Sequence, residues 1–142
     1  MIAYLDTSAF VPLLVDEPTT AACQRLWEDA DSVTVSRLVF VETAAALAQA
    51  HRLGRLTRQQ HRDSVDLLDS LWAELAVVEV DELVVRRAAS LADRYALRGY
   101  DAVHCASAEQ LGEEEFVAAT GDPALLDAWT SLGIAVFDTN QA

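Results

Sequence analysis

The stretch FVAATGDPALLDAWTSLGIAVF, residues 116–137, decides the fold of this chain. Its first part, Phe116–Thr120, is apolar and typical of a buried strand, and the Gly-Asp-Pro that follows is typical of a helix start. The pattern then predicts a helix over Pro123–Leu132 and another apolar strand at Ile134–Phe137. Apolar strands that alternate with helices favour a parallel sheet covered by helices on both faces.

The same alternation of strand and helix patterns runs through the rest of the chain. Further strands are expected at Ile2–Asp6, Ser32–Val35 and Ala76–Val80. Helices are expected over Thr7–Val15, Thr19–Ala30, Ser36–Arg52, Thr57–Leu75, Asp81–Leu97 and Asp101–Leu111, with Ser36, Thr57 and Asp81 as N-caps. Because no internal repeat or linker is visible, residues 1–142 are predicted to form a single α/β domain.

The charge balance excludes several functions. The formal net charge is −13, and all 10 basic residues are arginines. Without lysine the chain cannot use P-loop nucleotide binding, Schiff-base chemistry or lysine-dependent phosphotransfer, because arginine stays protonated. So large an acidic excess also argues against nucleic-acid binding by bulk charge alone, although a local basic patch or bound metal ions would permit it.

The composition also bears on where the protein resides. Hydrophobic residues make up 52% and charged residues 23%, which is typical of a globular protein. No apolar run approaches the ~18–20 residues that span a bilayer, and the N-terminus lacks a secretory pattern. Cys23 and Cys105 have no metal-ligand spacing and are expected to be reduced, buried thiols. These features predict a cytoplasmic protein without a membrane attachment.

Acidic residues stand beside strongly apolar runs at several places in the chain. These residues are Asp6, Glu42, Asp101 and Asp122. A carboxylate among buried side chains is costly unless it is paired, hydrogen-bonded or bound to a metal. Asp6 and Asp122 come at the ends of expected strands, and ligands of open parallel sheets bind beyond the carboxyl ends of the strands. The position of these acids is therefore that of a functional site.

A structural role would explain some of these acids equally well. Asp6, Asp101 and Asp122 each stand at the start of an expected helix, and Asp is a favoured N-cap. The two roles are compatible, because a cap at the carboxyl end of a strand also faces the cleft. Glu42 has no capping role, since its helical neighbours three and four residues away are apolar. Its place on or beside an apolar face favours a functional side chain.

A divalent cation would remove the conflict among these acids. Clustered carboxylates repel one another, and an all-oxygen ligand set favours Mg²⁺ or Mn²⁺ over zinc. Thr7, Ser8 and Thr120 are expected to add hydroxyl groups at the rim of the site. No Ser–His–Asp or Cys–His arrangement stands out, and His104 is expected to be a packed or surface residue of its helix.

Four stretches carry the acids, in a fixed order. They are YLDTSAFVPLLVDEP (4–18), SRLVFVETAAAL (36–47), LRGYDAVHCASA (97–108) and ATGDPALLDAWTSLGIAVFD (119–138). Together they resemble the four motifs of the PIN-domain nucleases, in particular the VapC-type toxins of bacterial toxin–antitoxin pairs. The last stretch departs from the family, which often has a polar residue before the acid and a basic residue after it. That departure puts a direct ligand role of Asp122 in question.

The resemblance implies both a fold and an activity. The fold is a three-layer α/β/α arrangement with a central parallel sheet of about five strands in the order 3-2-1-4-5. The acids would hold Mg²⁺ or Mn²⁺, with hydroxyl groups beside them from Thr7 or Ser8 and from Thr120. Such an ion polarises a phosphodiester, activates water and stabilises the leaving oxygen, which implies a metal-dependent endoribonuclease. The implied partners are RNA, a second copy of the chain and an inhibitory antitoxin protein.

One segment, HRLGRLTRQQHR at residues 51–62, is rich in arginine and contains no acid. Its arginines, at an expected turn between two helices, are Arg52, Arg55, Arg58 and Arg62. They fit a solvated helix end, or an arm that grips RNA phosphates, and the sequence leaves both interpretations open. Arg37, at the start of the helix that carries Glu42, is a second candidate for substrate contact.

Other functions are open to the same acids. A metal-bridged adhesion-type domain would bind a partner through an ion, and Asp6-Thr7-Ser8 gives half of its D-x-S-x-S pattern. Phe10 stands in place of its second Ser, and Glu42 has no role in it. A catalytically inactive PIN domain would bind only RNA or an antitoxin, but the presence of all the motif acids argues against lost catalysis.

Overall fold

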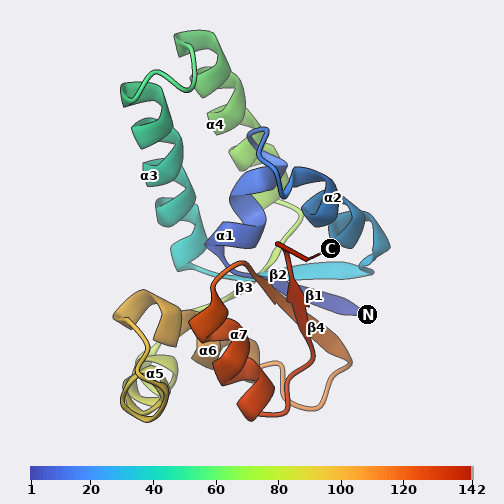
Figure 1. Ribbon diagram of the computed structural model, residues 1–142, viewed down its shortest axis with the longest axis vertical. Helices are drawn as coiled ribbons and strands as arrows, with labels where there is room; N and C mark the ends of the chain where they lie inside the picture. Colours follow the sequence, from blue (N-terminus) through green and yellow to red (C-terminus); the bar gives the residue numbers. More distant parts are fainter. Residues whose placement is uncertain (142) are drawn as a thin grey trace.

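The computed structural model describes residues 1–141, and a parallel sheet forms its middle layer (Figure 1). Within these residues the sheet has five strands, in the order β3-β2-β1-β4-β5. The strands are β1 (Ile2–Leu5), β2 (Ser32–Ser36), β3 (Ala76–Val78), β4 (Phe116–Thr120) and β5 (Val136–Asp138). All neighbouring strands are parallel, which confirms the predicted fold class and strand order.

Helices cover both faces of the sheet. One layer consists of α1 (Thr7–Phe10), the 3₁₀ turn η1 (Val11–Leu13), α2 (Thr20–Asp29), α3 (Leu38–Arg52) and α4 (Arg58–Trp72). The other layer consists of α5 (Glu82–Tyr95), α6 (Gly99–Glu109) and α7 (Pro123–Ser131). Because successive strand residues face opposite ways, Ala3 and Leu5 of β1 join the first core and Tyr4 joins the second. The described helices include none that is both long and apolar enough to cross a membrane.

Helices α3 and α4 pack against each other and project beyond the sheet (Figure 1). The turn between them uses Gly54, whose φ of 79° lies in the left-handed region that suits glycine. Thr57 then starts α4 with the predicted cap, a capping box in which it and Gln60 exchange hydrogen bonds. Beside this turn the rings of His51 and His61 stack, with centroids 5.0 Å apart. The arginine-rich segment therefore forms the tip of a helical hairpin, as expected.

The predicted starts of two helices were wrong. Ser36 belongs to β2, where it pairs with Val78, and α3 begins two residues later, at Leu38. The Ser36 hydroxyl still accepts a hydrogen bond from the Leu38 amide, at 3.2 Å. Asp101 does not cap α6 either, because α6 begins at Gly99 and Asp101 lies in its first turn.

Two strand boundaries also differ from the prediction. The third strand stops at Val78 rather than Val80, where the Arg37 amide bonds to the Val78 carbonyl and the chain turns away from the sheet. The last strand is Val136–Asp138 rather than Ile134–Phe137. The Ile134 amide bonds back to the Trp129 carbonyl, so this residue still closes the turn after α7.

Candidate active site

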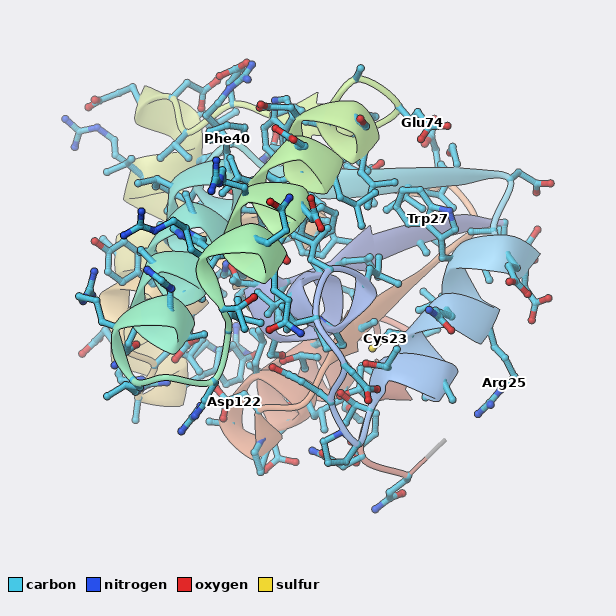
Figure 2. The ribbon with its side chains drawn as sticks, turned by 90° about the horizontal axis from the view of Figure 1, so that it is seen from above. Cys23, Arg25, Trp27, Phe40, Glu74 and Asp122 are labelled. Carbon is cyan, nitrogen blue, oxygen red and sulfur yellow. The ribbon has the colours of Figure 1, made fainter. Side chains whose placement is uncertain are left out.

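The candidate site lies at the carboxyl edge of the sheet, where neighbouring strands β1 and β4 end. Asp6 directly follows β1 and Asp122 lies two residues beyond β4, each as the N-cap of the next helix. Figure 2, viewed from the end to which α3 and α4 project, shows Asp122 at the start of α7. Glu42 comes from α3 in one helix layer and Asp101 from α6 in the other. The edge is therefore bordered by acids from every layer of the fold.

Asp6 is buried and surrounded by hydrogen-bond donors. Its Oδ1 accepts from the Ser8 hydroxyl at 2.7 Å and from the Ala9 amide at 3.0 Å, and its Oδ2 accepts from the Thr120 hydroxyl. Only 4% of the residue is exposed. Burial raises the pKa of Asp6 above its usual value, and the nearby His104 and the hydroxyl donors offset only part of this effect. The groups around Asp6 therefore do not fully stabilise its ionised form.

Two hydroxyls tie the β4 loop to the β1 loop. The Asp122 amide donates to the Thr120 hydroxyl and the Gly121 amide donates to the Ser8 hydroxyl, both at 3.0 Å. The hydroxyl oxygens of Thr120 and Ser8 lie 3.3 Å apart. These bonds place both hydroxyls and the backbone of Asp122 beside Asp6.

A close approach behind this loop requires glycine at position 121. A Cβ atom there would lie 3.0 Å from the Thr139 hydroxyl and 3.2 Å from the Asn140 amide nitrogen. The Asn140 side chain donates to the Gly121 carbonyl at 3.1 Å, so the segment after β5 packs directly on the loop. No local sequence pattern indicates a role for Asn140, because this contact forms only when β5 lies next to β4 in the sheet.

Glu42 lies at the cleft wall, with donors on one carboxylate oxygen. Its Oε1 accepts from the Thr7 hydroxyl at 2.9 Å and contacts Nε2 of His104 at 3.0 Å. Burial opposes ionisation of Glu42, but the hydrogen bond and charge of His104 and the Thr7 hydroxyl outweigh it and lower the pKa. His104 is 2% exposed and its Nδ1 contacts the Tyr4 hydroxyl at 3.0 Å. It is thus packed as predicted, yet its contact with Glu42 was missed.

Asp101 and Asp122 face the same guanidinium group. Arg98 donates from Nε to Oδ2 of Asp101 at 3.0 Å. This hydrogen bond and the charges of Asp101 and Asp122 raise the pKa of Arg98. The Asp101 side chain is 16% exposed and that of Arg98 is 85% exposed. The exposed arginine therefore places a positive charge beside Asp101 at the acidic edge, a contact that was not predicted.

The chemistry of the donor set fits a hard divalent cation. Thr7 and Ser8 at the start of α1 hold Glu42 and Asp6 respectively, while Arg98 donates to Asp101 and also feels the charge of Asp122. In residues 1–141 no three His, Cys, Asp or Glu side chains converge into a ready ligand cluster. Carboxylate and hydroxyl oxygens are ligands for Mg²⁺ or Mn²⁺, and a cation would relieve the buried charge of Asp6.

A groove of about 570 Å³ runs along α3 away from these acids. One face of the helix lines it from Glu42 to Arg52, and the exposed Tyr100 of α6 forms part of its wall. Ten residues of helix span about 15 Å. The groove therefore connects the acidic edge with the arginine-rich tip.

The arginines predicted to contact substrate fall into two classes. The arginines of the tip form no ion pair within the described chain. They are Arg52, Arg55, Arg58 and Arg62. Arg37 instead pairs with Glu79, and its guanidinium lies 5.9 Å from the centre of the Trp72 ring. Arg37 is thus paired with Glu79 and not with an acid of the site. The arginines of the tip can bind an anion.

The sheet order and the acids at its carboxyl edge are the features of a PIN domain, and the chain belongs to the PIN-domain family. The family model, described as PIN domain, matches residues 3–128. Ribonuclease VapC49 of Mycobacterium tuberculosis (strain ATCC 25618 / H37Rv) is 40% identical over 121 residues, which cover 85% of this chain and 84% of the relative. Ribonuclease VapC46 of the same strain is 33% identical over 133 residues, 94% of each chain.

Solved structures share the fold at lower sequence identity. FitAcB from Neisseria gonorrhoeae superposes with a TM-score of 0.75 and 20% identity, and the match covers 100% of both chains. VapC20 of Mycobacterium tuberculosis, described as a toxin that cleaves the sarcin-ricin loop, gives a TM-score of 0.67 at 20% identity, over 89% of this chain and 94% of that one. At these identities the likeness shows the fold alone.

Proposed function

We propose that this protein is an endoribonuclease that hydrolyses RNA phosphodiester bonds with Mg²⁺ or Mn²⁺ and acts as the toxin of a toxin–antitoxin pair. The observation that carries the proposal is the acidic edge, where buried Asp6 and hydrogen-bonded Glu42 are held by adjacent residues of α1. The relatives at 33% and 40% identity are named ribonucleases, which supports the same reaction.

The proposed metal ligands are the carboxylates of Asp6, Glu42, Asp101 and Asp122. A cation bound there would polarise the phosphate and lower the pKa of a water molecule. The chain's own task is to hold its carboxylates in place: Ser8 and Thr120 fix Asp6, and Thr7 fixes Glu42. The Asp122 carboxylate accepts from the Ala124 amide at 3.2 Å, so its capping role ties it to α7 and an outer ligand position suits it best.

The groove along α3 is the proposed path of the RNA. Along α3 it extends from Leu38 past Glu42 to Arg52, so a strand lying in it would reach the free arginines of the tip with a phosphate. Tyr100, which is 64% exposed, offers a ring on which an unpaired base could stack near the acids. Arg37 remains a substrate-binding candidate only if it exchanges Glu79 for a phosphate.

An antitoxin and a second copy of the chain are the proposed protein partners. Structural neighbours include VapBC-1 from nontypeable Haemophilus influenzae and FitAB bound to a DNA fragment. The acidic edge would accept an arginine or lysine side chain from an antitoxin, because charge-assisted hydrogen bonds to carboxylates are strong. Such an inhibitor would act inside the cell, so the cytoplasm is the proposed location.

The proposal is tested by incubating partner-free protein with total bacterial RNA and Mg²⁺ or Mn²⁺. We expect discrete cleavage products that disappear with EDTA and with Asp101→Asn. The matched control Asp93→Asn, an exposed acid on α5, should cut like the wild-type protein. Cleavage that survives Asp101→Asn would place the activity elsewhere.

A protein that binds Mn²⁺ but cuts no RNA would reject the nuclease function. The adhesion-type domain and the inactive PIN domain would both give this result. They differ in their next readout: an inactive PIN domain still retains labelled RNA in a filter-binding assay, whereas the adhesion-type domain does not.

A further inference from the structure

The side chain of His104, on α6, contacts one residue of β1 and one residue of α3. Its imidazole lies between the Tyr4 hydroxyl and the Glu42 carboxylate, at 3.0 Å from each. Tyr4 is on β1, two residues before Asp6, and His104 is on α6, three residues after Asp101. At this spacing His104 and Asp101 share a face of α6. The ring therefore connects Glu42 with the elements that hold Asp6 and Asp101.

The partners determine the direction of the hydrogen bond to Glu42. A carboxylate oxygen only accepts, so Nε2 of His104 carries a proton and donates to Oε1 of Glu42 whether the ring is neutral or charged. In the neutral ring Nδ1 accepts from the Tyr4 hydroxyl, and in the charged ring Nδ1 donates to it. Burial raises the pKa of Tyr4 well above its usual value, so its hydroxyl stays protonated in both cases. In both states Tyr4 holds the ring that donates to Glu42.

The two donors on Glu42 meet at the same oxygen. Thr7 and His104 both contact Oε1, and no hydrogen bond of the described residues involves Oε2. A carboxylate held by one oxygen in this way presents the other in a fixed direction. Outer groups that orient a metal ligand typically contribute 10–100-fold to metal affinity.

We infer that His104 is a positioning residue, which with Tyr4 behind it holds Glu42 so that Oε2 is free to bind a divalent cation. The inference rests on the proposed role of Glu42 as a metal ligand. It differs from the simpler role of His104 as a buried residue that satisfies its own hydrogen bonds, because it predicts an effect on metal affinity that is separate from stability.

A matched pair of substitutions separates these roles. In His104→Gln the amide nitrogen takes the place of Nε2 and can still donate to Glu42. In His104→Asn the amide group takes the place of Nδ1, next to Tyr4, and its nitrogen cannot reach Glu42. Both variants lose the ring and its packing, so their thermal stabilities in EDTA should fall by similar amounts.

The readout is the affinity for Mn²⁺, measured by isothermal titration calorimetry without RNA. We expect His104→Gln to bind within about threefold of the wild-type protein, and His104→Asn to bind about tenfold or more weakly. In RNA cleavage, the kcat of His104→Asn should fall while its KM stays at the wild-type value. Equal Mn²⁺ affinities in the two variants would overturn the inference, whether both match the wild type or both fall with stability.

Two further variants complete the test. Tyr4→Phe removes the hydroxyl that holds Nδ1, and we expect several-fold weaker Mn²⁺ binding. If neither His104 variant folds, wild-type affinity in Tyr4→Phe overturns the inference. Glu42→Gln tests the function on which the inference rests. Wild-type Mn²⁺ affinity in Glu42→Gln would reject the proposed ligand role, whereas weaker binding there with no loss in His104→Asn would reject only the role of His104.

Discussion

At the residue scale, the pKa values of two acids in the same site shift in opposite directions, although burial opposes ionisation of both. Asp6 is buried more deeply, and its hydroxyl and amide donors do not compensate, so its pKa is raised. Glu42 is partly exposed and contacts His104, so its pKa is lowered in spite of desolvation. Protein groups alone thus stabilise the charge of Glu42, while the charge of Asp6 lacks a sufficient partner. This difference makes Asp6 the carboxylate that gains most from a cation.

The cysteines provide a prediction for single residues. Burial raises the pKa of the Cys105 thiol to about 12, and burial also raises the pKa of Cys23. Because the thiolate is the reactive form, neither thiol should react with DTNB (5,5′-dithiobis-(2-nitrobenzoic acid)) in the native protein at pH 8. Both should react after unfolding in guanidinium, and Cys23→Ser isolates the signal of Cys105. Rapid stoichiometric labelling of the native protein would contradict this.

The sequence predicted the acids better than the groups that hold them. Asp6 and Asp122 could be placed because a strand end followed by a helix start is a local pattern. The contacts of His104 could not, because its partners Glu42 and Tyr4 lie 62 and 100 residues away along the chain. The contact of Arg98 was missed for a different reason. Arg98 pairs with Asp101 across the first turn of α6, and this helix was predicted to begin only at Asp101.

At the scale of elements, the ends of helices were harder to predict than the existence of the helices. The helix expected over Asp81–Leu97 ends earlier, because the left-handed residue that ends α5 is Ala96, with φ 54°. The next helix, expected to begin at Asp101, begins at Gly99. The buried positions Val84, Ala88 and Leu91 of α5 follow the helical repeat, so the existence of the helix was predictable even though its end was not.

The capping box of α4 predicts a measurable stability. Thr57 accepts from the Gln60 amide at 3.1 Å and its own amide donates to the Gln60 side chain at 2.9 Å. Thr57→Ala removes the first bond, so the free energy of unfolding should fall by about 1 kcal/mol in urea titration. Thr19→Ala is the matched control, because Thr19 is the N-cap of α2 but makes no capping bond. Equal losses in the two variants would contradict the capping role.

The tip of the α3–α4 hairpin predicts how RNA binding depends on salt. Replacing Arg52, Arg55 and Arg58 by Gln should raise KM about tenfold at an unchanged kcat, if these arginines bind RNA phosphates away from the acids as proposed. Each lost phosphate contact should also flatten the salt dependence, by about 0.7 in the slope of log affinity against log salt for a single strand.

A control for the hairpin variant must change the net charge equally. Gln at Arg25, Arg86 and Arg94, which are exposed on α2 and α5, removes the same positive charge away from the groove. This variant should retain the wild-type KM and salt slope. Equal effects of the two triple variants would show that bulk charge, and not the hairpin tip, governs RNA binding.

At the scale of the whole molecule, a net charge of −13 opposes the proposed substrate. The arginines of the hairpin tip have no acidic partner within the described chain, while Asp6, Glu42, Asp101 and Asp122 border the carboxyl edge of the sheet. An RNA strand along the groove, as proposed, would therefore be attracted at one end and repelled at the other unless a cation is present. With this distribution of charge, the proposed RNA binding would depend on the metal as well as on the arginines.

This dependence predicts that removing acids from the site strengthens RNA binding when no divalent metal is present. Two charges about 8 Å from a phosphate each repel it by roughly 0.5 kcal/mol in water, so Glu42→Gln with Asp101→Asn should bind RNA about fivefold more tightly in EDTA. The substitution also frees Arg98 for a phosphate. Fluorescence anisotropy of labelled RNA at low salt measures the change, and the gain should shrink above 0.1 M salt, where the Debye length falls below about 10 Å. The control pair Glu74→Gln with Asp93→Asn changes the charge equally at exposed positions away from the acidic edge, and equal gains in both pairs would contradict a local repulsion at the acidic edge.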